Sequence, residues 1–325
     1  MSSKRATVIG WTGGGRLDDL RASAGYILGD RRIGGKLHNA GSALALEGPE
    51  PISVAVVLKD LPGVAWVAAG RSGRSIAELG AEARKLAKAY VGSHDTFTVL
   101  AEGPTPREAS DLGGSLTSSI LEAVKGSRVS LESPEVIFRA SFDGKEGVVG
   151  VEVETGPGGV PTAKQEVVCL VSGGIHSSVM AWFAVLQGFR VTLVHVDSGE
   201  VGLRAVAHLY SELSHRADPR SLNVEVFQGG SLFRTLSDYA RKSRLPVYAG
   251  FSRTGESEPR TLTNVTAPLY LMPQERFMSE FDRLGLRGAE SETDWDAIDR
   301  GTPSSRRFGG KRADVSEVLD SLART

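Results

Sequence analysis

The sequence predicts an α/β protein: an N-terminal α+β half followed by a doubly wound domain built on a parallel sheet. The first observation is the continuous apolar run Val167–Val171, which is typical of a parallel strand buried on both faces. The second is the order that follows it, a Ser-Gly-Gly turn, an apolar helical segment and another apolar run at 191–196. The third is that strands continue to alternate with helices as far as about residue 285, which favours a parallel sheet covered on both faces.

Short strands and helices alternate in the N-terminal half, as in a small α+β unit. The helix at 75–90 is the best specified, because Ser75 and Glu78 form a capping box ahead of apolar residues at helical spacing. Asp143-Gly144 predicts a tight turn between the last two strands. In order, we expect strand 6–10, helix 17–28, strand 42–46, a short helix or strand at 54–61, strand 63–69, helix 75–90, strand 96–101, helix 107–124 interrupted at Gly113-Gly114, and strands 135–142 and 147–154.

The C-terminal half begins after a Gly/Pro-rich connector at 156–165, which marks a domain boundary. From Gly285 the chain is polar, and we expect a docking tail or a partly disordered one that ends in a short helix. Between these points we expect strand 167–171, helix 177–186, strand 191–196, helix 203–215, strand 223–227, helix 232–241, strand 246–250, strand 267–271, and helix 273–284 with proline at its start. The resulting division of the chain is 1–70, 71–163, 164–288 and a polar C-terminal tail at 289–325.

Composition narrows the class of protein. A chain of 325 residues can hold two or three domains, and a formal net charge of −1 means that binding to nucleic acid would depend on local basic patches. The single cysteine, Cys169, excludes an internal disulfide and a cysteine-based metal cluster, and its position within a strand suits a small hydrophobic residue. We find no signal peptide and no apolar run of about 18 residues, so we expect a cytoplasmic protein without a membrane segment.

The turn Ser172-Gly173-Gly174 has the chemistry of a phosphate-binding loop. Two glycines let the backbone approach an anion, and the helix behind them offers free N–H groups and a positive dipole end. Ser172, Ser177 and Ser178 add hydroxyl groups. No lysine follows the glycines, so the loop is not a Walker motif, and it is not G-x-G-x-x-G either. The alternative is that the glycine pair only allows the strand and helix to pack closely.

Two groups of basic residues are candidates for contact with a nucleic-acid backbone. Arg31, Arg32 and Lys36 lie beside glycines in a loop, and a second group lies on the helix at 75–90: Arg84, Lys85 and Lys88. The alternative for both groups is a solvated surface with no partner.

Ser-Gly-Gly-Ile-His-Ser directly after a strand resembles the PP-loop of ATP pyrophosphatases, S-G-G-x-D-S, with His176 at the acidic position. The plan of the chain from about residue 50 to 285 resembles the tRNA 4-thiouridine synthetases, also called tRNA sulfurtransferases. In that family a ferredoxin-like unit and an RNA-binding THUMP domain precede the PP-loop domain. The other stretches that carry the resemblance are Leu58–Val64, Asp95–Val99, Ser133–Val136, Val151–Glu154 and the linker Gly156–Pro161.

The resemblance implies a ferredoxin-like unit at 1–70, a THUMP-like domain at 71–163 and a PP-loop domain at 164–288. It also implies that ATP and Mg²⁺ activate a uridine of tRNA as an adenylate, and that sulfur then displaces AMP. The partners implied are tRNA and a separate sulfur donor protein. Carried over by position, the residues that contact ATP or its pyrophosphate are Ser172, Gly173, Gly174, His176, Ser177 and Ser178, with Asp197 and Ser198 facing the adenosine.

The chain departs from the family pattern at the acidic position of the loop and in its cysteines. His176 cannot supply a carboxylate for Mg²⁺; it either contacts phosphate when protonated or marks a lost activity. The cysteines that handle sulfur in the family have no counterpart, so we do not expect a persulfide on this chain. The sequence therefore assigns no catalytic residue and no metal ligand. It leaves two functions open: an ATP-dependent enzyme that adenylates tRNA, and a non-catalytic tRNA-binding or partner subunit with a degenerate PP-loop.

Overall fold

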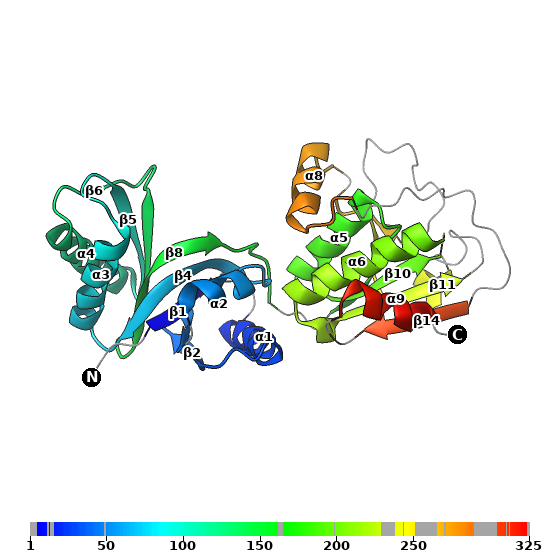
Figure 1. Ribbon diagram of the computed structural model, residues 1–325, viewed down its shortest axis with the longest axis horizontal. Helices are drawn as coiled ribbons and strands as arrows, with labels where there is room; N and C mark the ends of the chain where they lie inside the picture. The colour runs from blue at the N-terminus through cyan, green and yellow to red at the C-terminus, as the bar shows by residue number, and fades with distance from the viewer. Residues whose placement is uncertain are drawn as a thin grey trace. The chain divides into compact units, whose positions relative to one another are not determined.

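The computed structural model describes residues 5–11, 13, 16–48, 50–161, 165–197, 199–228, 238–242, 244–250, 265–269, 271–288, 304–309, 311 and 313–323. The chain forms two compact units, Met1–Pro161 and Thr162–Thr325, and each is built on its own sheet (Figure 1). None of the helices in the described ranges is long and apolar enough to cross a membrane.

The first unit is built on one eight-stranded sheet with the order β2-β3-β1-β4-β8-β7-β5-β6. Neighbours from β2 to β7 are antiparallel, whereas β5 runs parallel to both β7 and β6. The strands are β1 (Arg5–Trp11), β2 (Lys36–Ala40), β3 (Ala43–Glu47), β4 (Val64–Gly73), β5 (Thr96–Glu102), β6 (Arg128–Val129), β7 (Val136–Phe142) and β8 (Gly147–Thr155).

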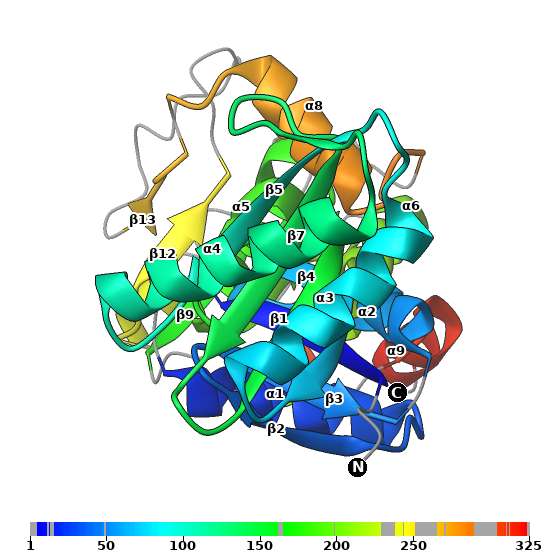
Figure 2. The same cartoon turned by 90° about the vertical axis from the view of Figure 1, so that its left-hand side faces the viewer.

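Two pairs of helices cover this sheet, and each pair has its own apolar core. Helices α1 (Leu17–Asp30) and α2 (Pro51–Leu58) enclose a core with Ile9 and Leu20 at its centre. Helices α3 (Ile76–Tyr90) and α4 (Pro106–Ala123) lie side by side, α3 over β4 and β8 and α4 over β5 and β7, and enclose a second core (Figure 2). The predicted cap at Ser75 is confirmed, because its hydroxyl accepts the Glu78 N–H at 3.2 Å.

The turn between β2 and β3, at one end of the first sheet, makes hydrogen bonds to strands β7 and β5 near the other end. The N–H of Ser42 in that turn donates to the Ser141 hydroxyl of β7 at 2.8 Å, and the Ser42 hydroxyl donates to the Glu102 carboxylate of β5. Strand β2, which the sequence does not predict, forms one edge of the sheet through its pairing with β3. Its half-exposed sequence lacks an apolar alternation, so its strand conformation depends on this pairing.

The expected break at Gly113-Gly114 is wrong, since α4 is continuous through both glycines. Glycine inside a helix costs about 1 kcal/mol relative to alanine, and tertiary packing overrides a cost of this size. Here the opposing face of the helix is fixed by the buried side chains of Leu112, Leu116 and Ile120.

The second unit contains a six-stranded sheet with the order β13-β12-β9-β10-β11-β14. All strands from β13 to β11 are parallel, as the sequence predicts, and β14 is antiparallel to β11. The strands are β9 (Glu166–Leu170), β10 (Arg190–Val196), β11 (Leu222–Gln228), β12 (Val247–Ala249), β13 (Val265–Thr266) and β14 (Ser304–Gly309).

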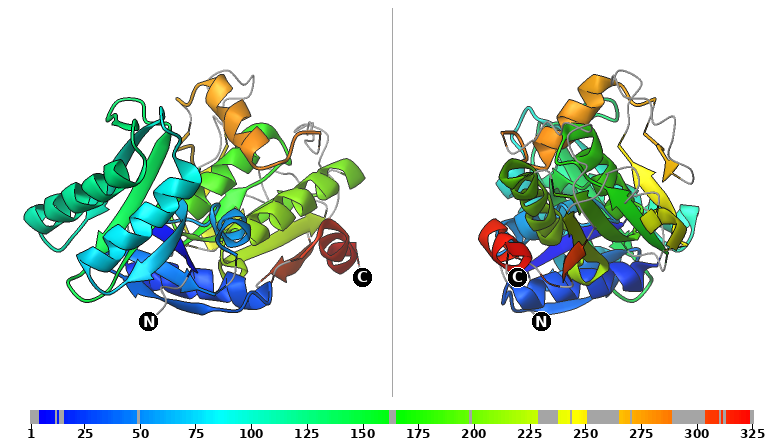
Figure 3. Two further views of the ribbon diagram at one scale, coloured as in Figure 1. Left: turned by 60° about the vertical axis from the view of Figure 1, so that its left-hand side comes forward. Right: turned by 90° about the vertical axis from the view of Figure 1, so that its right-hand side faces the viewer.

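Helices α5 (Ile175–Leu186), α6 (Glu200–Arg216), α8 (Gln274–Arg283) and α9 (Val315–Ala323) enclose the larger core of this unit. A smaller core on the other face includes Val168, Val194 and Ala240. Figure 3 shows the red helix α9 beside the yellow-green helix α6. A short 3₁₀ helix, η1 (Pro219–Ser221), leads into β11.

Two expectations for the second unit differ from the structure. Residues 267–271 do not form a strand in the ranges described; the strand in this region is the shorter β13, which pairs with β12. Of the helix expected at 232–241, only the end is described, within a helical stretch at 238–242, and the rest lies outside the described residues.

The segment expected to be a polar tail contributes β14 and α9 to the second unit. The sequence of β14 is polar and does not indicate a strand. β14 is an edge strand, and the charge of Arg307 is paired there, because its Nε donates to Glu225 at 2.7 Å. Glu225 is buried, and the Tyr239 hydroxyl also donates to it, at 3.0 Å. The ion pair raises the pKa of Arg307, and burial together with Glu225 raises the pKa of Tyr239. A buried carboxylate with two donors therefore fixes the strand.

Candidate functional site

The glycine-rich turn lies at the carboxyl end of β9, a central strand between β12 and β10. Val171 follows the strand, Gly173 has a left-handed backbone with φ of 89°, and Gly174 is the N-cap of α5. No side chain caps this helix end. Because the first N–H groups of any α-helix lack an acceptor within the helix, they remain for a ligand at this position. The turn thus presents backbone donors at the edge of the sheet where α/β proteins bind ligands.

The serine hydroxyls hold the turn in shape. Ser177 and Ser178 are both buried, and their hydroxyls donate to the Gly174 carbonyl at 3.0 Å and 2.9 Å. The Ser172 hydroxyl accepts the Gly174 N–H at 3.2 Å, and the Ser172 N–H donates to the Ser177 hydroxyl at 3.2 Å. The structure therefore brings the three serines together, and the hydroxyl protons of Ser177 and Ser178 are directed to Gly174.

His176 points its ring towards α8. Its Nε2 lies 2.8 Å from Gln274 Oε1, so the N–H donates to the amide oxygen. The ring also makes an edge contact with Phe277, with 4.6 Å between ring centroids. Since Phe277 is fully buried, this pair of contacts attaches the start of α8 to the first turn of α5.

Gly250, which follows β12, presses its backbone against the first turn of α5. A Cβ added at Gly250 would collide with the carbonyl group of His176 and the amide nitrogen of Ser177. Sequence reasoning did not assign Gly250 to the site; the available signal was a glycine at the carboxyl end of a strand beside the loop strand.

We expect Gly250→Ala to displace the first turn of α5, because the clash is with backbone atoms that cannot rotate away. Overpacking of this kind costs about 1–3 kcal/mol, which urea unfolding would measure. The matched control is Gly29→Ala, where an added Cβ meets nothing within 4 Å. Equal stability of the two variants would show that this close approach does not constrain the loop.

Asp197 follows β10 and shapes the turn that leads into α6. Its Oδ1 accepts the Gly199 N–H at 2.9 Å, and its own N–H donates to Phe227 at 2.8 Å. Its carboxylate is only partly buried. Ser198, the other residue expected at the adenosine, lies outside the described residues.

His195 is a buried residue of this region that the sequence reasoning missed. Its side chain is 1% exposed, and its Nδ1 lies 2.8 Å from the carbonyl oxygen of Val171, immediately before the glycine turn. A carbonyl only accepts, so Nδ1 carries the proton and the neutral ring leaves Nε2 as an acceptor. Burial lowers the pKa of His195, opposed by the bond to Val171 and by the charge of Asp197. The signal in the sequence is a histidine in an otherwise apolar strand.

We expect the stability of the protein to fall as the pH drops below about 6.5, the ordinary pKa of histidine. The reason is that His195 binds a proton more readily in the unfolded chain than in the fold, so protonation favours unfolding. Above that pH both states are neutral and the effect disappears. The check is urea unfolding between pH 5 and 8 against His195→Asn, whose amide can still donate to Val171 but does not titrate. The stability of the natural chain relative to His195→Asn should fall towards acid pH; a constant difference would contradict the assignment.

Cys169 is fully buried in β9, and burial raises the pKa of its thiol. A protonated, inaccessible thiol is a poor nucleophile and cannot accept sulfur from another protein. The structure thus agrees with the interpretation of Cys169 as a core residue.

The residues described do not form a metal site: no group of three or more His, Cys, Asp or Glu side chains comes together in these ranges. In the described residues the ring of His176 is engaged with Gln274, and Asp197, whose Oδ1 accepts the Gly199 N–H, is not joined by two further ligands of a metal site.

The six basic residues singled out in the first unit fall into two environments. Arg31, Arg32 and Lys36 are exposed at the end of α1 and the start of β2. On α3, by contrast, Arg84 pairs with Glu122 at 3.1 Å and Lys85 with Glu82 at 2.6 Å, while Lys88 is exposed. The first group keeps its charge available, whereas two of the three charges on α3 are offset.

Comparison with known proteins also singles out the part of the second unit that contains the glycine turn. A family model described as "Thiamine biosynthesis protein (ThiI)" matches residues 162–223, which contain the glycine turn. The probable tRNA sulfurtransferase of Halobacterium salinarum is 28% identical over 245 residues, which is 71% of this chain and 62% of that protein. The tRNA sulfurtransferase of Pyrobaculum aerophilum is 36% identical over 97 residues, 29% of this chain and 19% of that protein. The matched region therefore spans less than two thirds of these relatives.

Two solved structures share the fold. One is described as a 4-thiouridine synthetase–RNA complex with bound ATP; it matches with a TM-score of 0.67 and 16% identity over 98% of this chain and 95% of that chain. The other is PH1313 from Pyrococcus horikoshii, with a TM-score of 0.62 and 16% identity over 86% of this chain and 99% of that chain. At this level of identity the likeness concerns the fold.

Fold and site together define a two-unit α/β protein with a glycine- and serine-rich turn after a central parallel strand. The chain is similar to the ThiI family model over residues 162–223 and to tRNA sulfurtransferases over 71% of its length.

Proposed function

We propose that the chain is a tRNA-binding, ATP-binding protein of the cytoplasm that adenylates a uridine of tRNA for sulfur transfer. The observation that carries the proposal is the uncapped N-terminus of α5 behind Gly173 and Gly174, placed at the carboxyl end of β9. This proposal assigns residues 1–70 to a ferredoxin-like unit, 71–163 to a THUMP-like domain and 164–288 to a PP-loop domain. The relatives named as tRNA sulfurtransferases support the substrate class.

In this reaction the uridine O4 attacks the α-phosphorus of ATP, and the bond to the β-phosphate breaks as pyrophosphate leaves. A sulfur nucleophile then attacks C4, and the C4–O bond breaks to release AMP. The Gly173 N–H and the N–H groups of the first turn of α5 hold the pyrophosphate, whose charge the positive helix end stabilises. Ser172, Ser177 and Ser178 keep these donors in place through Gly174.

Sulfur reaches the site from outside this chain. Its one cysteine, Cys169, is buried and protonated, so it cannot carry a persulfide. The donor is therefore sulfide, or a separate sulfur donor protein whose persulfide attacks C4 and whose second thiol then cleaves the S–S bond, which leaves a disulfide on that protein.

A non-catalytic tRNA-binding or partner subunit is the second candidate function, and the side chain of His176 favours it. The position that would supply a carboxylate holds an imidazole engaged with Gln274 and Phe277 on α8. This side chain acts as a packing contact in the fold.

Calorimetry with ATP, in the presence and absence of Mg²⁺, tests whether the turn binds a nucleotide. We expect the ATP affinity of the natural chain to change little when Mg²⁺ is added. The ATP affinity of His176→Asp should increase with Mg²⁺, because aspartate supplies a carboxylate that can bind the ion. Gln274→Ala is the matched control, because it breaks the same hydrogen bond without adding a charge. Absence of ATP binding by the natural chain would reject the proposal.

For tRNA we expect the exposed group at the end of α1 to contribute more than the paired residues of α3. Changing Arg31, Arg32 and Lys36 together to Gln should weaken tRNA binding and make the plot of log affinity against log salt less steep, by about 1 for each phosphate that these side chains neutralise. The control is Arg84→Gln with Lys85→Gln, whose charges are already offset by Glu122 and Glu82. Gel shifts across a salt series measure both; equal slopes for all three proteins would contradict this assignment.

A further inference from the structure

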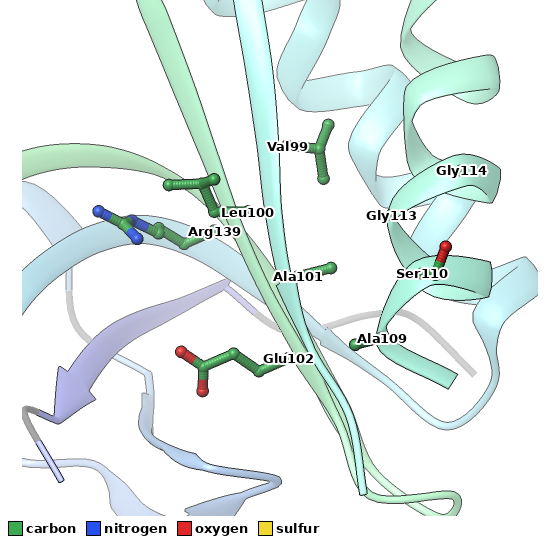
Figure 4. Close-up of a pocket in the computed structure, with 9 residues that line it drawn as sticks. All are labelled: Val99, Leu100, Ala101, Glu102, Ala109, Ser110, Gly113, Gly114 and Arg139. Atoms are coloured by element: carbon green, nitrogen blue, oxygen red, sulfur yellow. The ribbon is translucent and has the colours of Figure 1, made fainter. Parts of the chain in front are cut away.

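A hollow of about 510 Å³ lies beside β5 and α4 in the first unit (Figure 4). Figure 4 shows its two charged side chains, Glu102 and Arg139, on the side of β5 that faces away from α4. Both already have partners, because Arg139 Nε donates to Glu152 at 2.7 Å and Glu102 accepts from the Ser42 hydroxyl. The charges of this hollow are therefore explained by the fold itself.

His195, at the end of β10 in the second unit, carries a buried polar atom that the fold does not explain. The side chain is 1% exposed, and its Nε2 has no hydrogen-bond partner in the described part of the chain. Buried polar atoms without a partner destabilise a fold, and native structures contain few of them. The neighbouring residues of β10, Leu193, Val194 and Val196, are apolar. An apolar residue at position 195 would suit this strand and would not leave such an atom.

The ring of His195 lies on the face of the sheet that α5 covers. Side chains alternate between the two faces along a strand. Val194 and Val196 belong to the smaller core, whereas Leu193 belongs to the core that α5 helps to enclose. His195 is two residues from Leu193 and therefore shares its face. From there its Nδ1 reaches the neighbouring strand β9 and donates to the Val171 carbonyl oxygen at 2.8 Å.

Val171 lies where the chain leaves β9 for the glycine turn. Its N–H donates to Val194 O at 2.9 Å and so continues the ladder between β9 and β10 by one residue. Within a parallel ladder, the carbonyl of such a residue accepts a backbone N–H of the neighbouring strand. The Val171 carbonyl accepts from the ring of His195. A side chain thus supplies a donor to the last carbonyl before the turn.

The peptide group that joins Val171 to Ser172 is held at both of its polar atoms. Its carbonyl oxygen accepts from His195, and its N–H donates to the Ser177 hydroxyl at 3.2 Å. Because a peptide group is planar, fixing both polar atoms fixes its orientation. Only the two backbone dihedrals of Ser172 separate this plane from the peptide that carries the Gly173 N–H. The direction of that N–H therefore depends on the bond from His195.

We propose that His195 is a positioning residue for phosphate binding: through the Val171 carbonyl it fixes the peptide from which the glycine turn starts, and with it the direction of the Gly173 N–H towards the anion. This inference rests on the proposed nucleotide site. It explains why a histidine with a buried, unpartnered nitrogen stands among apolar residues, since an apolar side chain would fill the space but could not hold the carbonyl. His195 acts through the backbone and needs no contact of its own with the phosphates.

Calorimetry of the full chain with inorganic pyrophosphate, and separately with ATP, tests this role. His195→Leu fills the space but has no donor, and we expect it to bind both ligands about 10-fold more weakly, the effect of one lost hydrogen bond. His195→Asn, whose amide can still donate to Val171, should restore most of the affinity. Leu193→Ala is the matched control, because Leu193 is fully buried on the same strand and the same face. This control should be less stable in urea and bind both ligands as the natural chain does.

Backbone hydrogen exchange, measured by mass spectrometry without a ligand, provides the second arm. The segment 171–174 should exchange faster in His195→Leu than in the natural chain, His195→Asn or Leu193→Ala, because the peptide before the turn is released. Unchanged exchange in this segment, or a loss of affinity that Leu193→Ala shares or His195→Asn does not restore, would overturn the inference and leave the nucleotide site in place. A natural chain that binds neither pyrophosphate nor ATP would overturn both the inference and the proposed function.

Discussion

Gly173→Val abolishes ATP binding while both units remain folded: this is the largest functional effect we expect from a single substitution. Gly173 has φ of 89°, a region where a β-branched residue is a severe outlier, and strain of this kind costs about 1–3 kcal/mol. The chain relieves that strain by moving the turn, which displaces the N–H groups that we propose hold the pyrophosphate. We expect calorimetry to show at least a 100-fold loss of ATP affinity, equivalent to about 2.7 kcal/mol.

Gly144→Val is the matched control for this variant. Gly144 has nearly the same backbone angle, φ of 92°, but it lies in the turn between β7 and β8 of the first unit. It should show comparable strain with unchanged ATP affinity. If Gly173→Val binds ATP as well as Gly144→Val does, the turn is only a packing feature, and the nucleotide site lies elsewhere.

Trp182→Ala has the largest expected effect on stability. Trp182 is 1% exposed, lies on α5 and belongs to the main core of the second unit. Removing a buried aromatic side chain of this size costs about 3–5 kcal/mol through lost transfer energy and the cavity left behind. Urea unfolding followed by far-ultraviolet circular dichroism would measure the loss.

Trp182→Phe should cost much less, for a reason specific to this site. The indole Nε1 of Trp182 is buried without a hydrogen-bond partner in the described residues, and a group of this kind carries a penalty of about 1–3 kcal/mol. Phenylalanine loses part of the packing but also removes that penalty. Equal losses for the alanine and phenylalanine variants would show that the indole N–H is satisfied in solution.

The sequence predicts most of the framework because local signals and tertiary structure agree there. Apolar runs such as Val167–Val171 are buried on both faces, and Ser75 begins α3 as its capping box indicates. The failures occur where a long-range partner decides the conformation. Polar β14 becomes a strand because Arg307 pairs with buried Glu225, and in the described residues β13 consists of the two residues that pair with β12.

The sequence predicts less of the candidate site than of the fold. A Ser-Gly-Gly turn after a strand indicates where backbone donors will lie, but side-chain directions depend on neighbours that sequence spacing does not reveal. His176 lies beside the glycines in the sequence, yet its ring binds Gln274 on α8, 98 residues further along the chain. His195 and Gly250 reach the same turn from β10 and from the end of β12, and no motif connects them to it.

An ATP-dependent adenylation of tRNA is tested most directly by the nucleotide products. The full chain would be incubated with ATP, Mg²⁺, tRNA and sulfide, and AMP and thiolated nucleosides would be quantified by mass spectrometry. We expect AMP formation that requires tRNA, a matching amount of thiolated uridine and loss of both in Gly173→Val. A chain that binds ATP and tRNA but forms no AMP would contradict the enzymatic function and leave the non-catalytic one.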